Sequence, residues 1–265
     1  MKKLFVCLMA LTLLFTAAAM AETLKVGMEC NYAPFNWTQA EGSEFAVPIA
    51  AGGFADGYDV QIALFVAKEL GMDLEIVKTE RDGLPMALTS GKVDAIIAGM
   101  SPTAQRKLTI DFSDFYYQSD LVIVVNKGSQ YENATRLADF EGARISGQLS
   151  TFHYSVIDQI PGVIKQTALA DFPALIVALS SGRIDGYVSE RPGALSAMRS
   201  NPNLTFVAFG DGDGFAVTQG DTDIAVGLPK GSPLTAKINT ILAKLDENTR
   251  SQMMVAAVER QPLSE

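Results

Sequence analysis

The stretch ALSSGRIDGYVSERP, residues 178–192, repeats a pattern that the chain has already used in ALTSGKVDAIIAGMSP, residues 87–102. In both, Ala-Leu, a hydroxyl residue and Ser-Gly lead to a basic residue, a β-branched residue and Asp, and an apolar run follows. The pattern predicts a helix that ends at a glycine, followed by a buried strand. The runs end differently, in Gly99-Met100-Ser101 and in Ser189-Glu190. Two such units predict two lobes. Convergent helix–strand units without a shared site remain the alternative.

Strands and helices are expected to alternate along the rest of the chain. Such alternation is typical of an α/β fold, in which a largely parallel sheet is covered by helices. We expect strands at 24–28, 74–77, 93–98, 121–125, 143–148, 164–167, 184–188 and 223–228. We expect helices at 58–70, 84–89, 151–159 and 173–180, then two terminal helices, the first opened by Ser232 as N-cap and Pro233. The small, polar, Gly-rich residues 37–57 are predicted to be a loop insertion.

The N-terminus and the composition restrict the class of protein. Residues 1–21 carry two lysines, an apolar run and a small-residue cleavage site, which predicts a secretory signal peptide. The run is shorter than the ~20 residues of a membrane anchor, which is the alternative. Removing the segment would change the formal net charge from −9 to −11, which argues against a nucleic-acid partner. Cys30 would remain the one cysteine and His153 is the one histidine, so neither an internal disulfide nor a His-rich metal site is expected. We expect no metal and no cofactor.

Charged and hydroxyl residues follow the predicted central strands. Because ligands of open α/β sheets bind beyond the carboxyl ends of the strands, residues 99–101 of one lobe are expected to face Glu190 of the other. Ser101 is expected to cap one helical turn that leads to Arg106, whose guanidinium can grip a carboxylate with two hydrogen bonds. Ser150-Thr151, before the helix expected at Phe152, is a capping site that could hold the same anion. Glu190 would then meet an ammonium group. The alternatives are a solvent-facing arginine and a solvated glutamate, or one paired with its neighbour.

Five stretches, in this order and at this spacing, resemble the periplasmic amino-acid-binding proteins of ABC importers, in the polar group that includes the histidine, glutamine and lysine/arginine/ornithine binders. The stretches are 24–37, 57–71, 82–117, 145–152 and 181–190. The resemblance implies the type II periplasmic-binding-protein fold, with two hinge strands near 120–125 and 222–226. It implies a first lobe of residues 22–123 plus 224–265 and a second lobe of residues 124–223.

The resemblance also implies roles for individual residues. Arg106 would grip the ligand carboxylate with help from Ser101 and backbone N–H groups near Thr151. Glu190 and the carbonyl of Gly99 would take the α-ammonium, and Glu29 and Tyr32 would meet the side chain. The whole expected set is Glu29, Tyr32, Phe35, Arg81, Gly99, Met100, Ser101, Arg106, Gln148, Ser150, Thr151, Phe152 and Glu190.

Several of these positions depart from the family pattern. Glu stands at 190 and 29 where Asp is usual, Ser150 replaces a glycine, and Arg81 replaces an aromatic residue or leucine. If Arg81 pointed into the pocket, it could neutralise Glu29 or favour an acidic or neutral polar ligand. If its guanidinium stacked over Tyr32 or Phe35, Glu29 would stay free.

The function implied is capture of a polar amino acid and its delivery to the permease subunits of an ABC transporter in the membrane. Lysine, arginine or histidine is favoured as the ligand, and glutamine comes next. The protein is expected to be a monomer and no enzyme, and to be exported to the periplasm or the cell surface. Two other functions remain open: a periplasmic cyclohexadienyl dehydratase on the same scaffold, which would act on prephenate or arogenate, and a ligand-sensing subunit of a membrane receptor.

Overall fold

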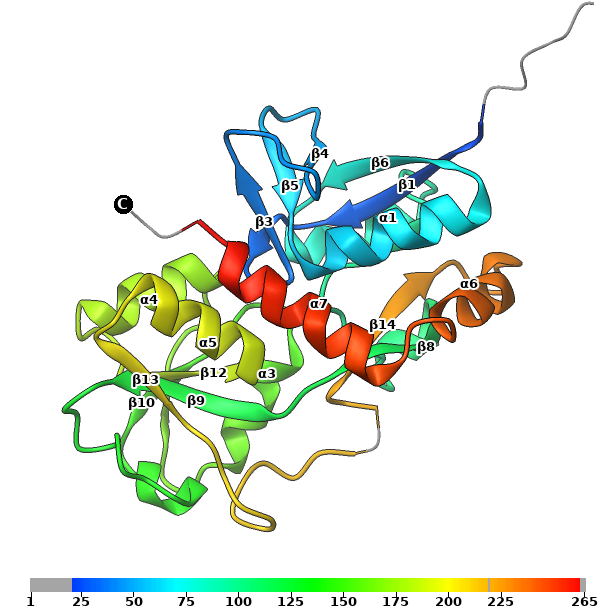
Figure 1. Cartoon of the computed structure of the whole chain (residues 1–265). Coiled ribbons are helices and arrows are strands. Elements are labelled where there is room, and N and C mark those ends of the chain that lie inside the picture. Colours follow the sequence, from blue (N-terminus) through cyan, green and yellow to red (C-terminus); the bar gives the residue numbers. More distant parts are fainter. Residues whose placement is uncertain (1–20, 219, 263–265) are drawn as a thin grey trace, which may run out of the picture.

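The computed structural model describes residues 21–218 and 220–262 (Figure 1). The predicted signal peptide therefore lies outside the described residues, apart from Ala21. Within the described part, no helix is long and apolar enough to cross a membrane.

The first lobe is built on a five-stranded mixed sheet with the strand order β6-β1-β7-β14-β8. Strand β1 runs parallel to β6 and β7, whereas β14 runs antiparallel to β7 and β8. Strands and helices follow the expected alternation, and the inward residues of β1 are fully buried. The elements of this lobe are β1 (Thr23–Met28), α1 (Tyr58–Leu70), β6 (Asp73–Lys78), η1 (Arg81–Gly83), α2 (Leu84–Thr89), β7 (Ala95–Ile96), η2 (Arg106–Leu108), β8 (Asp111–Gln118), β14 (Asp223–Leu228) and α6 (Leu234–Leu242).

The second lobe has a sheet of the same size, in the order β11-β10-β12-β9-β13. Strand β10 is parallel to β11 and β12, and β9 is antiparallel to β12 and β13. Its elements are β9 (Leu121–Asn126), η3 (Leu137–Phe140), β10 (Arg144–Ser146), α3 (Phe152–Ser155), η4 (Val156–Gln159), β11 (Ile164–Lys165), α4 (Phe172–Ser180), β12 (Gly186–Glu190), α5 (Arg191–Ser200) and β13 (Leu204–Val207). The chain is thus a two-lobed α/β protein of the expected class.

The chain crosses between the lobes twice. It passes from β8 to β9 through Ser119 and Asp120, and it returns before β14. The two crossings touch, because the Ser119 N–H donates to the Thr222 carbonyl at 3.2 Å. Helix α7 (Glu247–Arg260) then packs against α1 of the first lobe and α5 of the second (Figure 1). The exact lobe boundaries and the hinge positions stay predictions.

The repeated helix–strand unit is present in both lobes. Helices α2 and α4 both lead into a glycine in the left-handed conformation, Gly91 at φ 74° and Gly182 at φ 71°. Each is followed by a central strand, β7 or β12. Strand β7 is only two residues long, because the chain leaves regular pairing before Gly99.

The loop predicted at 37–57 is wrong in part, because residues 37–39, 47–48 and 54–56 belong to strands of a small antiparallel sheet. The strand order is β2 (Asn31–Tyr32), β3 (Asn36–Gln39), β5 (Phe54–Asp56) and β4 (Val47–Pro48). Strands β3, β4 and β5 each bury an apolar side chain, namely Trp37, Val47 and Ala55. Burial of these few residues against the first lobe outweighs the low strand propensity of their neighbours.

Other elements differ in extent or were missed. Helix α6 begins at Leu234 with Pro233 as its N-cap, so Ser232 is not the cap. The helix expected at 151–159 divides into α3 and η4, and the strand expected at 93–98 shortens to β7. Strands β8 and β13 and helix α5 were not predicted.

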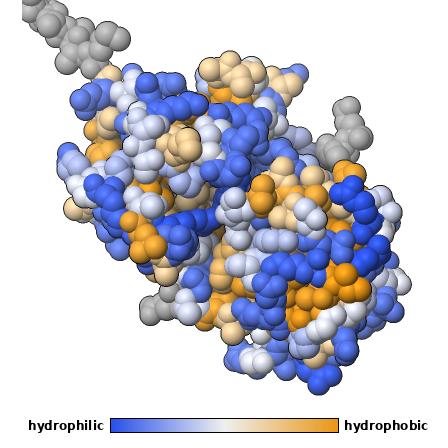
Figure 2. All heavy atoms as spheres, turned by 180° about the vertical axis from the view of Figure 1, so that it is seen from behind, coloured by the Kyte–Doolittle hydropathy of each residue, from blue (hydrophilic) through white to orange (hydrophobic). Residues whose placement is uncertain are grey.

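The largest cluster of buried apolar side chains runs through both lobes. At its centre Tyr32 of the first lobe stacks on Phe172 of the second, with ring centroids 4.4 Å apart and planes 8° from parallel. Each lobe also has a smaller core of its own. From behind, both lobes show a mosaic of hydrophilic and hydrophobic residues (Figure 2). The lobes are therefore packed together, and the structure is that of a closed molecule.

Candidate functional site

The candidate site lies where strand ends of the two lobes face each other. Glu29 follows β1, and Gln148 follows β10 of the other lobe. The Gln148 amide donates from Nε2 to both carboxylate oxygens of Glu29, at 3.1 and 3.2 Å. Nearby, Asn31 Nδ2 donates to Asp171 Oδ2 at 2.7 Å. Polar side chains thus bridge the lobes at this edge of the cleft.

Arg106 is a half-buried cation that bridges the lobes. Its guanidinium donates to the Ser101 carbonyl at 2.9 Å and to the Ser150 carbonyl of the other lobe at 3.0 Å. Among the residues that the structure describes, no carboxylate forms an ion pair with it. Burial, together with the nearby Arg81 charge, lowers the pKa of Arg106 to about 9. A poorly solvated arginine without a counter-ion is a receptor for an anion, above all a carboxylate.

Arg81 points into the cleft and is 6% exposed. Its Nη1 lies 3.6 Å from Glu29 Oε2, and its Nη2 donates to the Gly99 carbonyl at 3.0 Å. The guanidinium also lies over the ring of Tyr32, 6.0 Å from the centroid. Burial raises the pKa of the Glu29 carboxyl, and Arg81 acts against this rise. The two arrangements expected as alternatives, pairing with Glu29 and stacking over Tyr32, therefore occur together.

Glu190, the last residue of β12, contacts a residue that the sequence analysis did not place in the site. Its Oε1 lies 3.1 Å from Nε2 of His153, which stands on α3. Burial raises the pKa of Glu190 to about 8, with a further rise from Glu29. Burial, with the charges of Arg81 and Arg106, lowers the pKa of His153 to about 3. The contact is therefore a hydrogen bond between neutral groups at neutral pH and not an ion pair. A buried polar residue beside the predicted Phe152 was the only signal available in the sequence.

A buried network behind the cleft positions Gly99. The hydroxyl of Tyr116 donates to Asp59 Oδ1 at 2.7 Å and accepts the Gly99 N–H at 3.3 Å. Asn36 Nδ2 donates to the other oxygen of Asp59 at 2.7 Å. Gly99 itself has φ 55°, and a Cβ there would lie 2.9 Å from the ring of Tyr32, so a glycine is required. Sequence reasoning missed this network, although an aspartate on the buried face of α1 was a signal for it.

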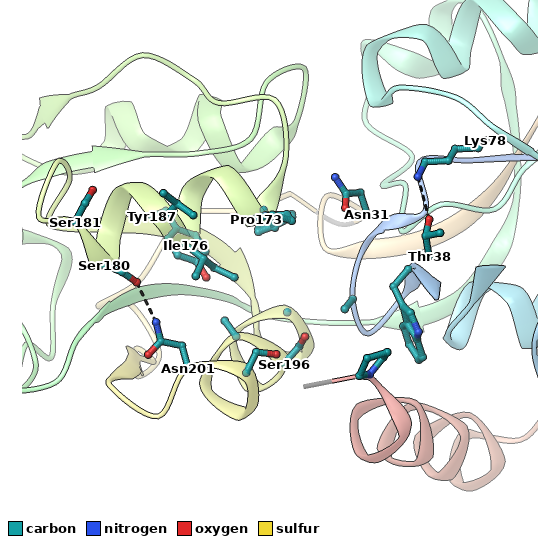
Figure 3. A pocket seen from close by; sticks show the side chains of 18 residues that line it. Asn31, Thr38, Lys78, Pro173, Ile176, Ser180, Ser181, Tyr187, Ser196 and Asn201 are labelled. Atoms are coloured by element: carbon teal, nitrogen blue, oxygen red, sulfur yellow. Dashed lines mark hydrogen bonds between the residues drawn. The ribbon is translucent and has the colours of Figure 1, made fainter. Parts of the chain in front are cut away.

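The cavities between the lobes include a polar one and a mostly apolar one, and a third, of about 200 Å³, is lined by Glu80, Arg81, Asp82, Leu149 and Ala170. The polar one has a volume of about 100 Å³ and is lined by Glu29, Asn31, Lys78, Glu80, Arg81, Ala170 and Asp171. The mostly apolar one has a volume of about 840 Å³, and Figure 3 shows residues from α4, β12 and α5 on one side of it and from β2, β3 and β6 on the other. None of Glu29, Arg106 and Glu190 lines it. The polar cavity is lined by Glu29 and Arg81 of the charged site, whereas Arg106 and Glu190 line neither this cavity nor the mostly apolar one.

The structure brings eight of the thirteen expected residues into this arrangement, namely Glu29, Tyr32, Arg81, Gly99, Arg106, Gln148, Ser150 and Glu190. Ser101 contributes its carbonyl, but it does not cap a helix, because η2 starts at Arg106 with Gln105 in the capping position. Thr151 does not cap α3 through its side chain, since its hydroxyl donates to the Gln148 carbonyl at 2.7 Å.

The remaining three residues pack into apolar cores. Phe35 packs edge-on against Tyr58, Met100 joins a core of the first lobe, and Phe152 packs against that of the second. Their contact with a ligand stays a prediction.

Comparison with known proteins places the chain in a family. A probable histidine-binding protein of Campylobacter jejuni is 32% identical over 199 residues, 73% of this chain and 71% of that protein. An amino acid ABC transporter substrate-binding protein of Streptococcus pneumoniae, solved with L-arginine bound, superposes with a TM-score of 0.77 at 29% identity, covering 89% of this chain and 94% of that one.

A solved ancestral amino-acid-binding protein, described as a precursor of cyclohexadienyl dehydratase, gives a TM-score of 0.73 at 26% identity, over 89% of this chain and 95% of that chain. The model of the bacterial extracellular solute-binding proteins, family 3, matches residues 24–256. This chain belongs to that family of bacterial extracellular solute-binding proteins.

Proposed function

We propose that the protein captures one polar amino acid between its lobes and delivers it to the permease of an ABC transporter. The observation that carries the proposal is Arg106, a cation that reaches from one lobe to the other and has no carboxylate partner in the described part of the chain. An α-carboxylate of a ligand would supply the missing negative charge. Glu190, on the other lobe, would take the α-ammonium through its carboxylate.

The side-chain pocket favours a basic ligand. Three carboxylates and two cations line the polar cavity, so its lining carries a formal charge of −1. Asp171 and Glu80 both add to the unfavourable field at Glu29 and help to raise its pKa. A cationic side chain would relieve this field. Lysine, arginine or histidine is therefore favoured and glutamine comes next, in agreement with the histidine and arginine named for the relatives.

The proposed transport role implies a membrane partner and a location outside the cytoplasmic membrane. We expect a monomer that works in the periplasm or at the cell surface and meets permease subunits of the membrane in its closed form. Closure follows from the site itself, because a zwitterion can satisfy Arg106 and Glu190 together only when the lobes approach.

The test is to identify what the protein binds. The protein is purified, mildly denatured, and the released small molecules are identified by mass spectrometry. A thermal-shift panel of the twenty amino acids then ranks the ligands, because a compound that binds only the native state raises the melting temperature. Stabilisation by basic amino acids or glutamine is the expected result. Failure of all twenty amino acids to stabilise the protein would overturn the proposal.

A dehydratase on the same scaffold is the alternative, and the family and its named amino-acid-binding relatives do not favour it. Burial raises the pKa of the Glu190 carboxyl to about 8, so that at neutral pH it holds a proton that a general acid can donate. Incubation with prephenate or arogenate separates the two functions. Formation of the aromatic product at a rate that Glu190→Gln abolishes would establish the enzyme, and no turnover would leave the binding protein.

A further inference from the structure

His153 stands beside the charged group that is expected to meet the ligand ammonium. Its Nε2 lies 3.1 Å from Glu190 Oε1, and both side chains are at most 5% exposed. The second carboxyl oxygen, Oε2, is buried and has no hydrogen-bond partner within the described residues. One oxygen of Glu190 is thus occupied by the imidazole, and the other is left for a donor that does not come from the described chain.

The ring of His153 is held in place from a second side. It packs edge-on against Phe172, with centroids 5.8 Å apart and planes at 77°. Phe172 in turn stacks on Tyr32 of the other lobe. The imidazole is therefore oriented by the aromatic stack that joins the closed lobes, and Glu190 is oriented by the imidazole.

Burial, reinforced by nearby positive charges, keeps the imidazole neutral by lowering the pKa of His153. Arg81 and Arg106 both disfavour a positive charge on His153, and Glu29 is the other carboxylate whose field reaches Glu190. A neutral imidazole can donate one hydrogen bond from Nε2 without adding a cation that would compete with an ammonium for the carboxylate.

We infer that His153 is a positioning residue for recognition of the ligand α-ammonium: it holds Oε1 of Glu190 so that Oε2 is presented to the ammonium. The inference rests on the proposed function, because it assigns the residue that sets the selectivity of the same site for an α-amino group. When the ammonium arrives, Glu190 is a carboxylate, its Oε1 accepts from the imidazole Nε2–H, and its Oε2 accepts from the ligand.

The test compares each amino acid with its deamino analogue, which keeps the carboxylate and the side chain but lacks the ammonium. A panel of all twenty amino acids on the unmodified protein first identifies the one that binds most tightly. That amino acid is then compared with its own deamino analogue, for example L-arginine with deamino-arginine. Calorimetry then measures both compounds on the unmodified protein, on His153→Phe, on His153→Gln and on the control Tyr154→Phe. Phenylalanine keeps the packing on Phe172 but donates no hydrogen bond, whereas glutamine restores an N–H donor at a similar reach.

His153→Phe should weaken the binding of the amino acid by about tenfold or more, which is the effect expected from losing one hydrogen bond to a charged group. The affinity for the deamino analogue should change by no more than a few-fold. The ratio of the two dissociation constants should thus fall, and His153→Gln should restore most of it. Tyr154→Phe alters a ring that packs beside Lys165 and should leave the ratio unchanged.

The outcomes distinguish this inference from the proposed function. Equal weakening of both compounds in His153→Phe would mean that His153 only packs, and an unchanged ratio would overturn the inference while amino-acid binding stands. A His153→Gln variant that fails to recover the ratio although it melts like the unmodified protein would also overturn it. An unmodified protein that binds none of the twenty amino acids would overturn the proposed function, and this inference with it.

Discussion

Arg106 of the first lobe donates a hydrogen bond to the backbone carbonyl of Ser150 in the second lobe, at 3.0 Å. Ser150 has φ 59°, so the chain turns sharply where its carbonyl meets the guanidinium. The same guanidinium holds the Ser101 carbonyl of its own lobe. One side chain thus links the closed state of the molecule to the expected position of a ligand carboxylate.

Replacing Arg106 should remove the largest single contribution to ligand binding. Truncating one partner of a desolvated charge pair costs ~2–5 kcal/mol, so Arg106→Ala should weaken amino-acid binding by at least ~30-fold. The fold should survive, because the side chain is half-buried and lies outside the apolar cores. Lys107→Ala, which removes the neighbouring exposed cation, is the control. Calorimetry that finds the Arg106 variant within a few-fold of the unmodified protein would refute its role as the carboxylate clamp.

Ligand binding should shift the molecule from an open to a closed form. The rotation is expected near residues 120–125 and 222–226, where the chain crosses between the lobes. Small-angle scattering with saturating ligand should give a more compact particle than without it. Trp37, the one tryptophan, lines the cavity between the lobes and packs beside Arg260, so its emission should change as well. Identical scattering curves would indicate a preformed closed cleft or a site within one lobe.

Glu29 and Arg81 should decide which side chain is accepted. If the ligand is basic, Glu29→Gln removes its counter-charge. The binding free energy of basic amino acids should then weaken more than that of glutamine, by over ~1 kcal/mol. Arg81→Leu should then leave basic ligands unharmed or improve them, because a like charge is gone. If Arg81 itself holds the ligand, Arg81→Leu should abolish binding and Glu29→Gln should do little. A thermal-shift panel on both variants reads this out, and a Glu29→Gln variant with an unchanged preference for basic ligands would exclude the basic assignment.

Amino-acid affinity should depend on pH through Glu190. Burial raises the pKa of this carboxyl to about 8 in the free protein, whereas an ammonium requires the carboxylate. Binding should therefore release one proton, and affinity should rise up to about tenfold per pH unit until it levels off near that pKa. The stability of the free protein should change in the opposite sense: it should fall as pH rises toward 8, since the unfolded chain gives up this proton more readily.

Calorimetry in buffers of different ionisation enthalpy counts the released protons. Glu190→Gln should bind more weakly and should lose the pH dependence over this range. A pH profile that is equally steep in Glu190→Gln would assign the released proton to another group.

Tyr116 should support the site from behind. Its hydroxyl joins Asp59 to the Gly99 N–H, and Tyr116→Phe leaves both buried groups without this partner. The free energy of unfolding should fall by about 1–3 kcal/mol. Tyr117→Phe, a change at the neighbouring half-buried ring, is the matched control and should change stability less. Equal stability of the two variants in urea denaturation would show that the network does not hold Gly99.

The helix–strand units could be predicted from the sequence because their signals are local. The predicted helices at 58–70 and 84–89 have the bounds of α1 and α2, and glycines follow α2 and α4 in the left-handed conformation. Hydrophobic periodicity and glycine conformations act within a few residues, so no knowledge of the fold is required. The small sheet β2–β5 escaped prediction because its strands are stabilised by burial against the first lobe, which their own composition does not reveal.

The charged site, too, could be predicted only in part from the sequence. The sequence by itself determined that two strand ends carry complementary chemistry, Glu190 on one and the segment leading to Arg106 on the other, because residue type and element order are local properties. Only the tertiary structure decided that Arg81 both pairs with Glu29 and lies over Tyr32, and that His153 contacts Glu190. Each of these contacts joins residues of one lobe that are far apart in the chain. They form through side-chain packing and burial, and burial also shifts the pKa values of the buried groups, so the contacts exist only once each lobe has folded.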